Sequence, residues 1–216
     1  LSNVDLSNVD LSNVDLSNKD ITNVDLSNKD LSNTLLRGSN LTYVDLSNVD
    51  LSNKDLSNTN FTDVNLSNTN LTNTNFSGTT LSNVQLTKVI AINSTFSHAL
   101  MNYVDISQSN FSNSVFLNSE ISNLTSLGTI IDYSNLSYSE ISDSNLQGTH
   151  LKNSKLTQMN FTDSNLNRII FTGSHMNNMF FENTSIVLSN FEYVILENYE
   201  FIDVTMNCIN HKICEQ

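Results

Sequence analysis

Large apolar residues recur at every fifth position along almost the whole chain. From Leu1 to Met206 every fifth residue is Leu, Ile, Phe or Met, except for Ala91 and Ser126. The residues between them are mostly Ser, Thr, Asn and Asp, and no insertion or deletion breaks the phase. An internal repeat of this regularity is the strongest structural signal in the chain.

A five-residue period fits neither an α-helix nor a flat β-strand. A helix advances about 100° per residue, so this period would wind the apolar stripe around it, and a strand alternates every two residues. A chain that turns a corner after every five residues keeps each apolar residue on one axis. Four such units make a square coil of 20 residues, and coils stack at the strand spacing of about 4.8 Å. The pattern therefore predicts an all-β solenoid, a parallel β-helix of about eleven coils.

Residues 20 apart in the sequence should lie above one another in this solenoid. Their apolar side chains then stack into columns inside the rod, and each buried side chain contributes about 1.5–3 kcal/mol. We expect the structural core to include Leu6, Leu26, Leu46, Phe61, Phe76, Phe96, Phe161 and Phe181.

The repeating unit has a small residue, then Asp or Asn, then Leu or Phe, then two polar residues. Examples are Val4-Asp5-Leu6-Ser7-Asn8, Thr59-Asn60-Phe61-Thr62-Asp63 and Ser164-Asn165-Leu166-Asn167-Arg168. This unit resembles that of the pentapeptide-repeat family. The resemblance covers residues 1–206 and implies a right-handed quadrilateral β-helix. The repeat dissolves after that point, so we expect residues 207–216 to form a C-terminal cap or the start of a following segment.

Two departures from the repeat predict local irregularities. Lys19, Lys29 and Lys54 occupy the second inward position of their units, and we expect their side chains to turn outward because an isolated buried charge is costly. At Ala91 and Ser126 the central residue is small, which predicts a local shift or bulge.

The chain is acidic, with a net charge of −13 and a pI of about 4.3. This charge argues against binding to nucleic acids or anionic membranes, and it favours basic partners. Aspartates such as Asp10, Asp30 and Asp50 should stack in outward columns, where Asp commonly accepts hydrogen bonds from turn amides. The resemblance also implies a second possibility, because some family members, the gyrase-inhibiting quinolone-resistance proteins, present charge in the way that DNA does.

No catalytic, cofactor-binding or metal-binding residue is predicted. Asp143 and Asp163 should be stacked neighbours, with Glu120 and Glu140 close by, and carboxylates of this kind can bind hard cations or serve acid–base chemistry. A rod filled with side chains offers no cleft for such chemistry. The four histidines fall in four different columns, so no histidine-based metal site is expected.

The two cysteines, Cys208 and Cys214, lie close together near the C-terminal end. They could pair with each other, but two cysteines do not make a disulfide framework and do not indicate a compartment. The localisation therefore stays open between a cytoplasmic and a secreted bacterial protein.

Apolar residues at positions that should face solvent point to an interface. They become more frequent toward the C-terminal coils, and exposed apolar side chains often mark contacts with a partner. The candidate partner-binding residues are Val115, Ile130, Ile170, Phe180, Leu188, Ile195 and Ile202.

These observations favour a non-enzymatic structural scaffold, a protein-binding solenoid that contacts a protein partner or a second copy through its C-terminal coils. Leu1 stands within a near-perfect repeat, so we expect the solenoid to be the repeat domain of a larger protein, and the resemblance implies that this could be a bacterial protein or secreted effector. The alternative is an acidic DNA mimic that binds a type II topoisomerase, DNA gyrase. Neither hypothesis involves direct nucleic-acid binding or a membrane.

Overall fold

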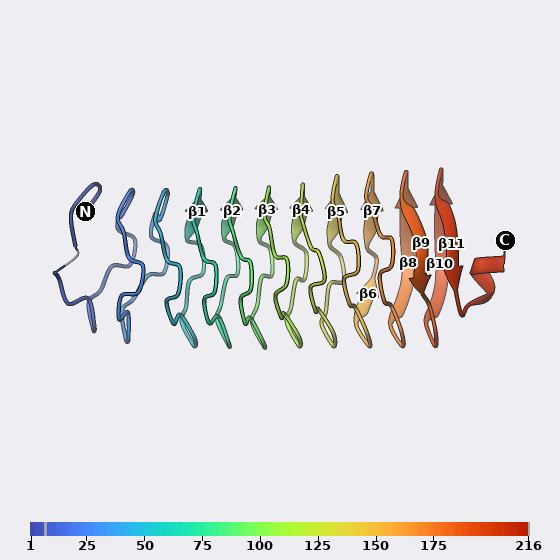
Figure 1. Cartoon of the computed structure of the whole chain (residues 1–216), viewed down its shortest axis with the longest axis horizontal. Helices are drawn as coiled ribbons and strands as arrows, with labels where there is room; N and C mark the ends of the chain where they lie inside the picture. Colours follow the sequence, from blue (N-terminus) through green and yellow to red (C-terminus); the bar gives the residue numbers. More distant parts are fainter. Residues whose placement is uncertain (7, 216) are drawn as a thin grey trace.

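The computed structural model describes residues 1–6 and 8–215, and it shows a straight rod of stacked coils (Figure 1). Ser7 and Gln216, which belong to the first quoted repeat and to the predicted C-terminal segment, lie outside the described residues. Successive coils pair through parallel bridges between residues 20 apart, for example Asp25↔Asp45 and Asn145↔Asn165. The parallel β-helix with a 20-residue coil is therefore confirmed.

The paired segments are short, because the chain turns a corner in every repeat unit. One continuous ladder follows the order β1-β2-β3-β4-β5-β7-β8-β10, with β6 also paired to β8, and β11 pairs with β9. Before β1, isolated bridges such as Asp20↔Asn40 continue the same pairing, so the strand ladder spans fewer coils than the eleven predicted. The strands are β1 (Asn60–Thr62), β2 (Thr80–Ser82), β3 (Leu100–Asn102), β4 (Glu120–Ser122), β5 (Glu140–Ser142), β6 (Lys155–Thr157), β7 (Asn160–Thr162), β8 (His175–Glu182), β9 (Ser185–Asn190), β10 (Ile195–Ile202) and β11 (Thr205–Ile209).

The corners explain the frequent asparagines. After every central residue from Leu11 to Phe201, the residue two places further on has a positive φ, as in Asn13 (φ 62°) and Asn113 (φ 60°). Asn adopts this left-handed conformation at lower cost than other residues with a side chain, because its short polar side chain bonds locally. Tyr103 (φ 54°) and Leu188 (φ 57°) stand at equivalent corners without that advantage.

The central residues fill the inside of the rod. All eight predicted core residues are buried, the most exposed being Leu6 at 7%. In one column Phe76, Phe96 and Phe116 stack face to face, with ring centroids 4.8 and 5.0 Å apart. This distance matches the coil spacing of about 4.8 Å, so aromatic stacking and backbone pairing reinforce each other.

Many second inward positions hold a buried Ser or Thr, and within the described residues Thr184 Oγ1 is the one buried side-chain polar atom that has no hydrogen-bond partner. Thr74 Oγ1 donates to Leu51 O at 2.9 Å, and Ser134 Oγ donates to Phe111 O at 3.0 Å. These two hydroxyls therefore link one coil to the coil before it, which offsets the cost of burying them.

The predicted bulges at Ala91 and Ser126 are wrong. The bridges Ile90↔Asn110 and Thr125↔Asn145 keep the 20-residue spacing through both places. Ser126 is fully buried, and its Oγ lies 2.9 Å from Thr149 Oγ1. Leu124 occupies the neighbouring inward position that Val104 fills one coil earlier. We attribute the unbroken register to this larger neighbour, which restores core volume without a backbone shift.

The C-terminal end carries a short 3₁₀ helix, η1 (Lys212–Glu215), beyond β11. A disulfide joins Cys208 to Cys214, and Ile213 is buried. The predicted boundary at residue 206 falls inside β11, which continues its parallel pairing with β9 as far as Ile209. In the described part of the chain, no helix has the length and hydrophobicity that crossing a membrane requires.

Candidate protein-binding face

The strand ladder exposes one continuous face of the rod, which we call the strand face. It consists of the outward side chains of 60–63, 80–83, 100–103, 120–123, 140–143, 160–163, 180–183 and 200–203. In the three-residue strands of this ladder the central residue is buried, whereas its two neighbours are exposed or half-buried. Strand pairing with no register shift therefore aligns the outward side chains in columns along the rod.

At its N-terminal end the strand face satisfies its own polar groups. Asn60 Nδ2 donates to Asn40 Oδ1 at 3.1 Å and to Thr42 Oγ1 at 3.2 Å. Thr62 Oγ1 donates in turn to Asn60 Oδ1 at 2.8 Å. These groups are already bonded to one another, so they offer little to a partner.

The C-terminal half of the strand face is different, because it carries carboxylates that have no intramolecular partner. Within the described residues, the side chains of Glu120, Glu140, Glu182 and Glu200 make no hydrogen bond or ion pair. Glu120 and Glu140 are paired in register on β4 and β5, so like charges lie directly opposite each other. No Lys, Arg or His occurs in the eight segments of this face.

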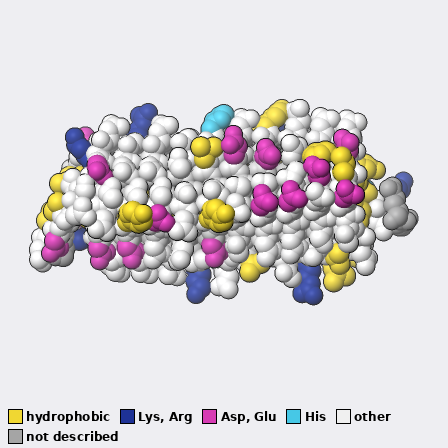
Figure 2. Space-filling model, turned by 90° about the horizontal axis from the view of Figure 1, so that it is seen from above, with side chains coloured by type: hydrophobic (Ala, Val, Ile, Leu, Met, Phe, Trp, Pro, Cys, Tyr) yellow, Lys and Arg dark blue, Asp and Glu magenta, His cyan; other side chains and the backbone are white. Residues whose placement is uncertain are grey.

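A second row of carboxylates follows the adjoining corner. Asp143, Asp163 and Asp203 occupy left-handed corner positions in one column. Asp163 Oδ1 accepts a hydrogen bond of 3.2 Å from Asn183 Nδ2. Figure 2 shows the result, with acidic side chains gathered over the C-terminal coils of the face turned to the viewer.

Apolar side chains stand among and beside these carboxylates. Leu100 (48% exposed) and Tyr103 (62% exposed) border the acidic rows on the N-terminal side. Phe180, Tyr199 and Ile202 lie at the C-terminal end, where Phe180 pairs in register with Glu200, and Ile202 with Glu182. The strand face thus combines unpaired negative charge with exposed apolar surface.

The aspartates of the N-terminal coils serve a structural purpose instead. The backbone amides of Ser12 and Ser32 donate to Asp10 Oδ1 and Asp30 Oδ1 at 2.9 and 2.8 Å. These hydrogen bonds hold the pKa of both carboxyls below the usual value for aspartate. The predicted turn-capping role is therefore confirmed for these columns.

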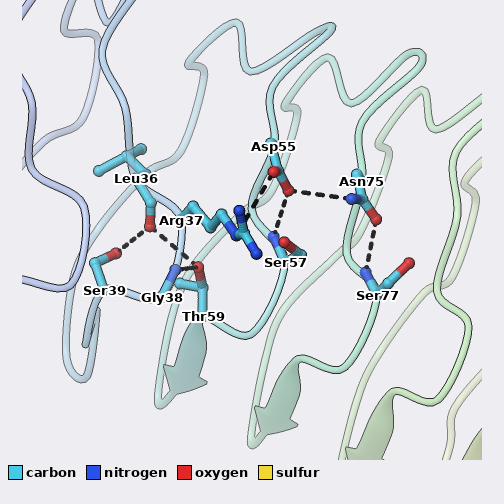
Figure 3. A network of polar contacts seen from close by, with 9 residues as sticks. All are labelled: Leu36, Arg37, Gly38, Ser39, Asp55, Ser57, Thr59, Asn75 and Ser77. Atoms are coloured by element: carbon cyan, nitrogen blue, oxygen red, sulfur yellow. Dashed lines mark hydrogen bonds and ion pairs between the residues drawn. The ribbon is translucent and has the colours of Figure 1, made fainter.

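Figure 3 shows how such capping continues along a column. Asp55 Oδ1 accepts hydrogen bonds from Ser57 N at 3.0 Å and from Asn75 Nδ2 at 3.1 Å. Arg37 Nε lies 3.8 Å from the other Asp55 oxygen. Asn75 then caps its own turn through Ser77 N, at 3.0 Å. Asn can therefore replace Asp in this role without loss of the cap.

The lysines at inward positions behave as expected. Lys19 is exposed, Lys54 Nζ donates to Thr34 O at 3.2 Å, and Lys29 Nζ lies 3.4 Å from Val9 O. Partial burial lowers the pKa of Lys54. The ammonium groups of Lys29 and Lys54 therefore lie at a backbone carbonyl of the preceding coil and do not enter the apolar core.

The structure does not bring the seven predicted partner-binding residues together. Val115 and Ile195 share one face, Ile130 and Ile170 another, and Leu188 lies at a corner of a third. Only Phe180 and Ile202 belong to the strand face. Leu188, Ile195 and Ile202 are exposed, whereas Val115, Ile130, Ile170 and Phe180 are half-buried.

The predicted proximity of Asp143, Asp163, Glu120 and Glu140 agrees with the structure. Within the described residues, no group of three or more His, Cys, Asp or Glu side chains could hold a metal ion.

The sequence reasoning missed Leu100, Tyr103 and Tyr199, and it did not connect Glu182, Glu200 and Asp203 with the other carboxylates. Sorting the outward residues by a 20-residue period would have placed all of them except Tyr199 on one face, because Tyr199 stands at a second inward position and is exposed on the last coil.

Comparison with known proteins identifies the repeat. A model of the family described as pentapeptide repeats matches residues 1–38, 20–53, 39–78, 79–116 and 139–178. No curated protein sequence matches the chain.

Among solved structures, the chain is similar to HetL, a pentapeptide repeat protein involved in heterocyst differentiation regulation in the cyanobacterium Nostoc. The two are 17% identical, with 93% of this chain and 88% of HetL covered and a TM-score of 0.55. QnrB1, a plasmid-mediated fluoroquinolone resistance protein, is 11% identical over 92% of this chain and 91% of its own, with a TM-score of 0.48. The likeness to HetL concerns the fold, and the family match covers most of the sequence. This chain belongs to the pentapeptide-repeat family.

Proposed function

We propose that this chain is a non-enzymatic scaffold that binds a basic protein partner through the C-terminal half of its strand face. The observation that carries the proposal is the contrast between its two kinds of carboxylate. Asp10 and Asp30 accept turn amides, whereas Glu120, Glu140, Glu182 and Glu200 have no partner within the described residues. Like charges that lie opposite each other on neighbouring strands lower stability. Such locally unfavourable arrangements are expected at functional sites.

The proposal is tested with two variants that lose the same charge. The face variant is Glu120→Gln, Glu140→Gln, Asp143→Asn and Asp163→Asn. The cap variant is Asp10→Asn, Asp30→Asn, Asp45→Asn and Asp50→Asn. It should stay folded because Asn65 and Asn70 already cap the equivalent turns, accepting amide hydrogen bonds of 3.0 and 3.1 Å.

Binding of a fluorescent oligolysine peptide is measured at about 50 mM and about 300 mM salt, with duplex DNA as a second probe. We expect the peptide to bind the wild type and the cap variant alike, the face variant to bind about tenfold more weakly, and DNA not to bind. An equal loss in both variants would show that net charge alone attracts the peptide, and would contradict the proposal.

A second candidate function is mimicry of DNA toward a topoisomerase. The observation that favours it is the regular arrangement of carboxylates on the strand face, with Glu120 and Glu140, and Asp143 and Asp163, on successive coils. Supercoiling by DNA gyrase with added protein tests it directly. Inhibition that fades with salt and disappears in the face variant would support mimicry, and unchanged supercoiling at micromolar protein would count against it.

We further propose that residues 207–215 close the C-terminal end of the solenoid. Half-buried Leu196, Phe201 and Met206 of the last coil pack against the core, and the disulfide between Cys208 and Cys214 tethers η1 beside them. A solenoid needs such an end to protect its open edge.

A further inference from the structure

We infer that the partner segment that fits the strand face is a basic amphipathic α-helix lying along the rod. This inference rests on the proposed function and adds the shape of the partner to it. All charged side chains of the strand face from Glu120 to Asp203 are acidic. A cationic segment is complementary to this face, whereas a second copy of this chain would bring like charges together.

The spacing of the rows favours a helix over a strand. Each of the five coils from Glu120 to Asp203 carries at least one carboxylate on the strand face, in one column or another, and these coils lie about 4.8, 9.6, 14.4 and 19.2 Å along the axis from the first. Helix residues i+3, i+6, i+10 and i+13 lie about 4.5, 9.0, 15.0 and 19.5 Å from residue i, so basic residues at this spacing stay in step with the coils. Residues on one side of an extended strand recur only every 6.6 Å or so, which falls out of step after one coil.

The apolar residues fix the two ends of the proposed helix. Leu100 and Tyr103 lie on the coil before the acidic rows, and Phe180 and Ile202 lie at their far end. An open hollow beside that far end is bordered by Phe180, Tyr199 and Glu200. From Leu100 to Phe180 the ladder advances four coils, about 19 Å, which a helix of about 13 residues spans. The partner helix should therefore carry Lys or Arg in its middle and a large apolar residue near each end.

The test uses three synthetic peptides of one composition. The first places Lys with helical spacing between two apolar residues, the second places Lys at alternate positions, and the third is scrambled. Affinities are measured by fluorescence anisotropy against the wild type, the face variant, the cap variant and a variant with Phe180→Asn and Ile202→Thr. Asn160 and Thr162 occupy the columns of Phe180 and Ile202, one and two coils earlier, so the fold should be retained.

We expect the helical peptide to bind the wild type at least about tenfold more tightly than the other two. Its affinity should fall about tenfold in the face variant and severalfold in the Phe180 and Ile202 variant, and should not change in the cap variant. Its circular dichroism should become helical on binding.

If all three peptides bind equally but depend on the face carboxylates, the helix inference fails and the proposed function stands. If no peptide shows that dependence, both fail.

Discussion

Glu120 and Glu140 lie directly opposite each other on the neighbouring parallel strands β4 and β5, at equivalent positions one coil apart. Neither side chain has a hydrogen-bond or salt-bridge partner within the described residues. Like charges opposed in this way destabilise a sheet. The pair therefore represents a local cost that the fold itself does not require.

The substitution Glu140→Gln should stabilise the protein. Removing one charge of the pair should raise the free energy of unfolding by about 0.2–1 kcal/mol, and added salt should stabilise the wild type more than the variant. Urea unfolding at low and high salt measures both effects. Glu197, an exposed carboxylate in β10 whose register partner is Asn177, provides the control substitution Glu197→Gln, which should change little. Equal effects of the two substitutions would show that the opposed pair has no particular cost.

A large apolar residue at position 126 should be tolerated only when Ser126 and Leu124 are substituted together. Ser126→Leu alone inserts a large side chain beside Leu124 and should destabilise the protein by about 1–3 kcal/mol. Leu124→Val alone should cost about 0.5–1.5 kcal/mol by leaving a small cavity. The double variant gives the Val and Leu pattern that Val84 and Leu86 show two coils earlier, so its stability should lie close to that of the wild type. Thermal unfolding of all four proteins gives the coupling energy, and simple additivity of the two losses would refute the volume compensation.

The corner at Leu188 should be improved by asparagine. Leu188 is 53% exposed and has φ 57°, whereas Asn68 occupies an equivalent corner with φ 59°. Leu188→Asn should therefore raise the free energy of unfolding by about 1 kcal/mol, because Asn adopts the left-handed conformation more readily. The reverse change, Asn68→Leu, should lower it by a similar amount. A destabilised Leu188→Asn variant would mean that the leucine packs favourably enough to outweigh the strain.

The fold could be predicted from the sequence, whereas the register at Ser126 and much of the strand face could not. The fold was predictable because the five-residue period repeats without interruption. The burial of core residues such as Leu6 and Phe161 follows from their positions in that period. The unbroken register at Ser126 was not predictable from the period, because it depends on packing against Leu124. The strand face was only partly predictable. Glu120 and Asp143 could be placed together by their spacing, but which carboxylates lack a structural partner depends on hydrogen bonds that the three-dimensional structure reveals.

Acid should weaken the N-terminal coils selectively. Hydrogen bonds from the Ser12, Ser17 and Ser32 amides lower the pKa values of Asp10, Asp15 and Asp30 in the folded protein. A depressed folded-state pKa contributes stability that is present above the unfolded value of about 3.9 and is lost as the pH falls through the lower folded value. Hydrogen exchange should therefore show the first coils losing protection below about pH 4. Replacing the three aspartates with Asn should remove this dependence, and unchanged acid sensitivity in that variant would contradict the assignment.

The most direct test of the central claim, that the free carboxylates of the strand face form a docking surface, is an NMR titration of the labelled protein with the helical basic peptide. The account predicts that perturbed amides map to the strand face between Leu100 and Asp203 and leave the aspartate columns at Asp10 and Asp30 unchanged. Perturbations that follow all the acidic columns, or that concentrate on the N-terminal coils, would contradict it.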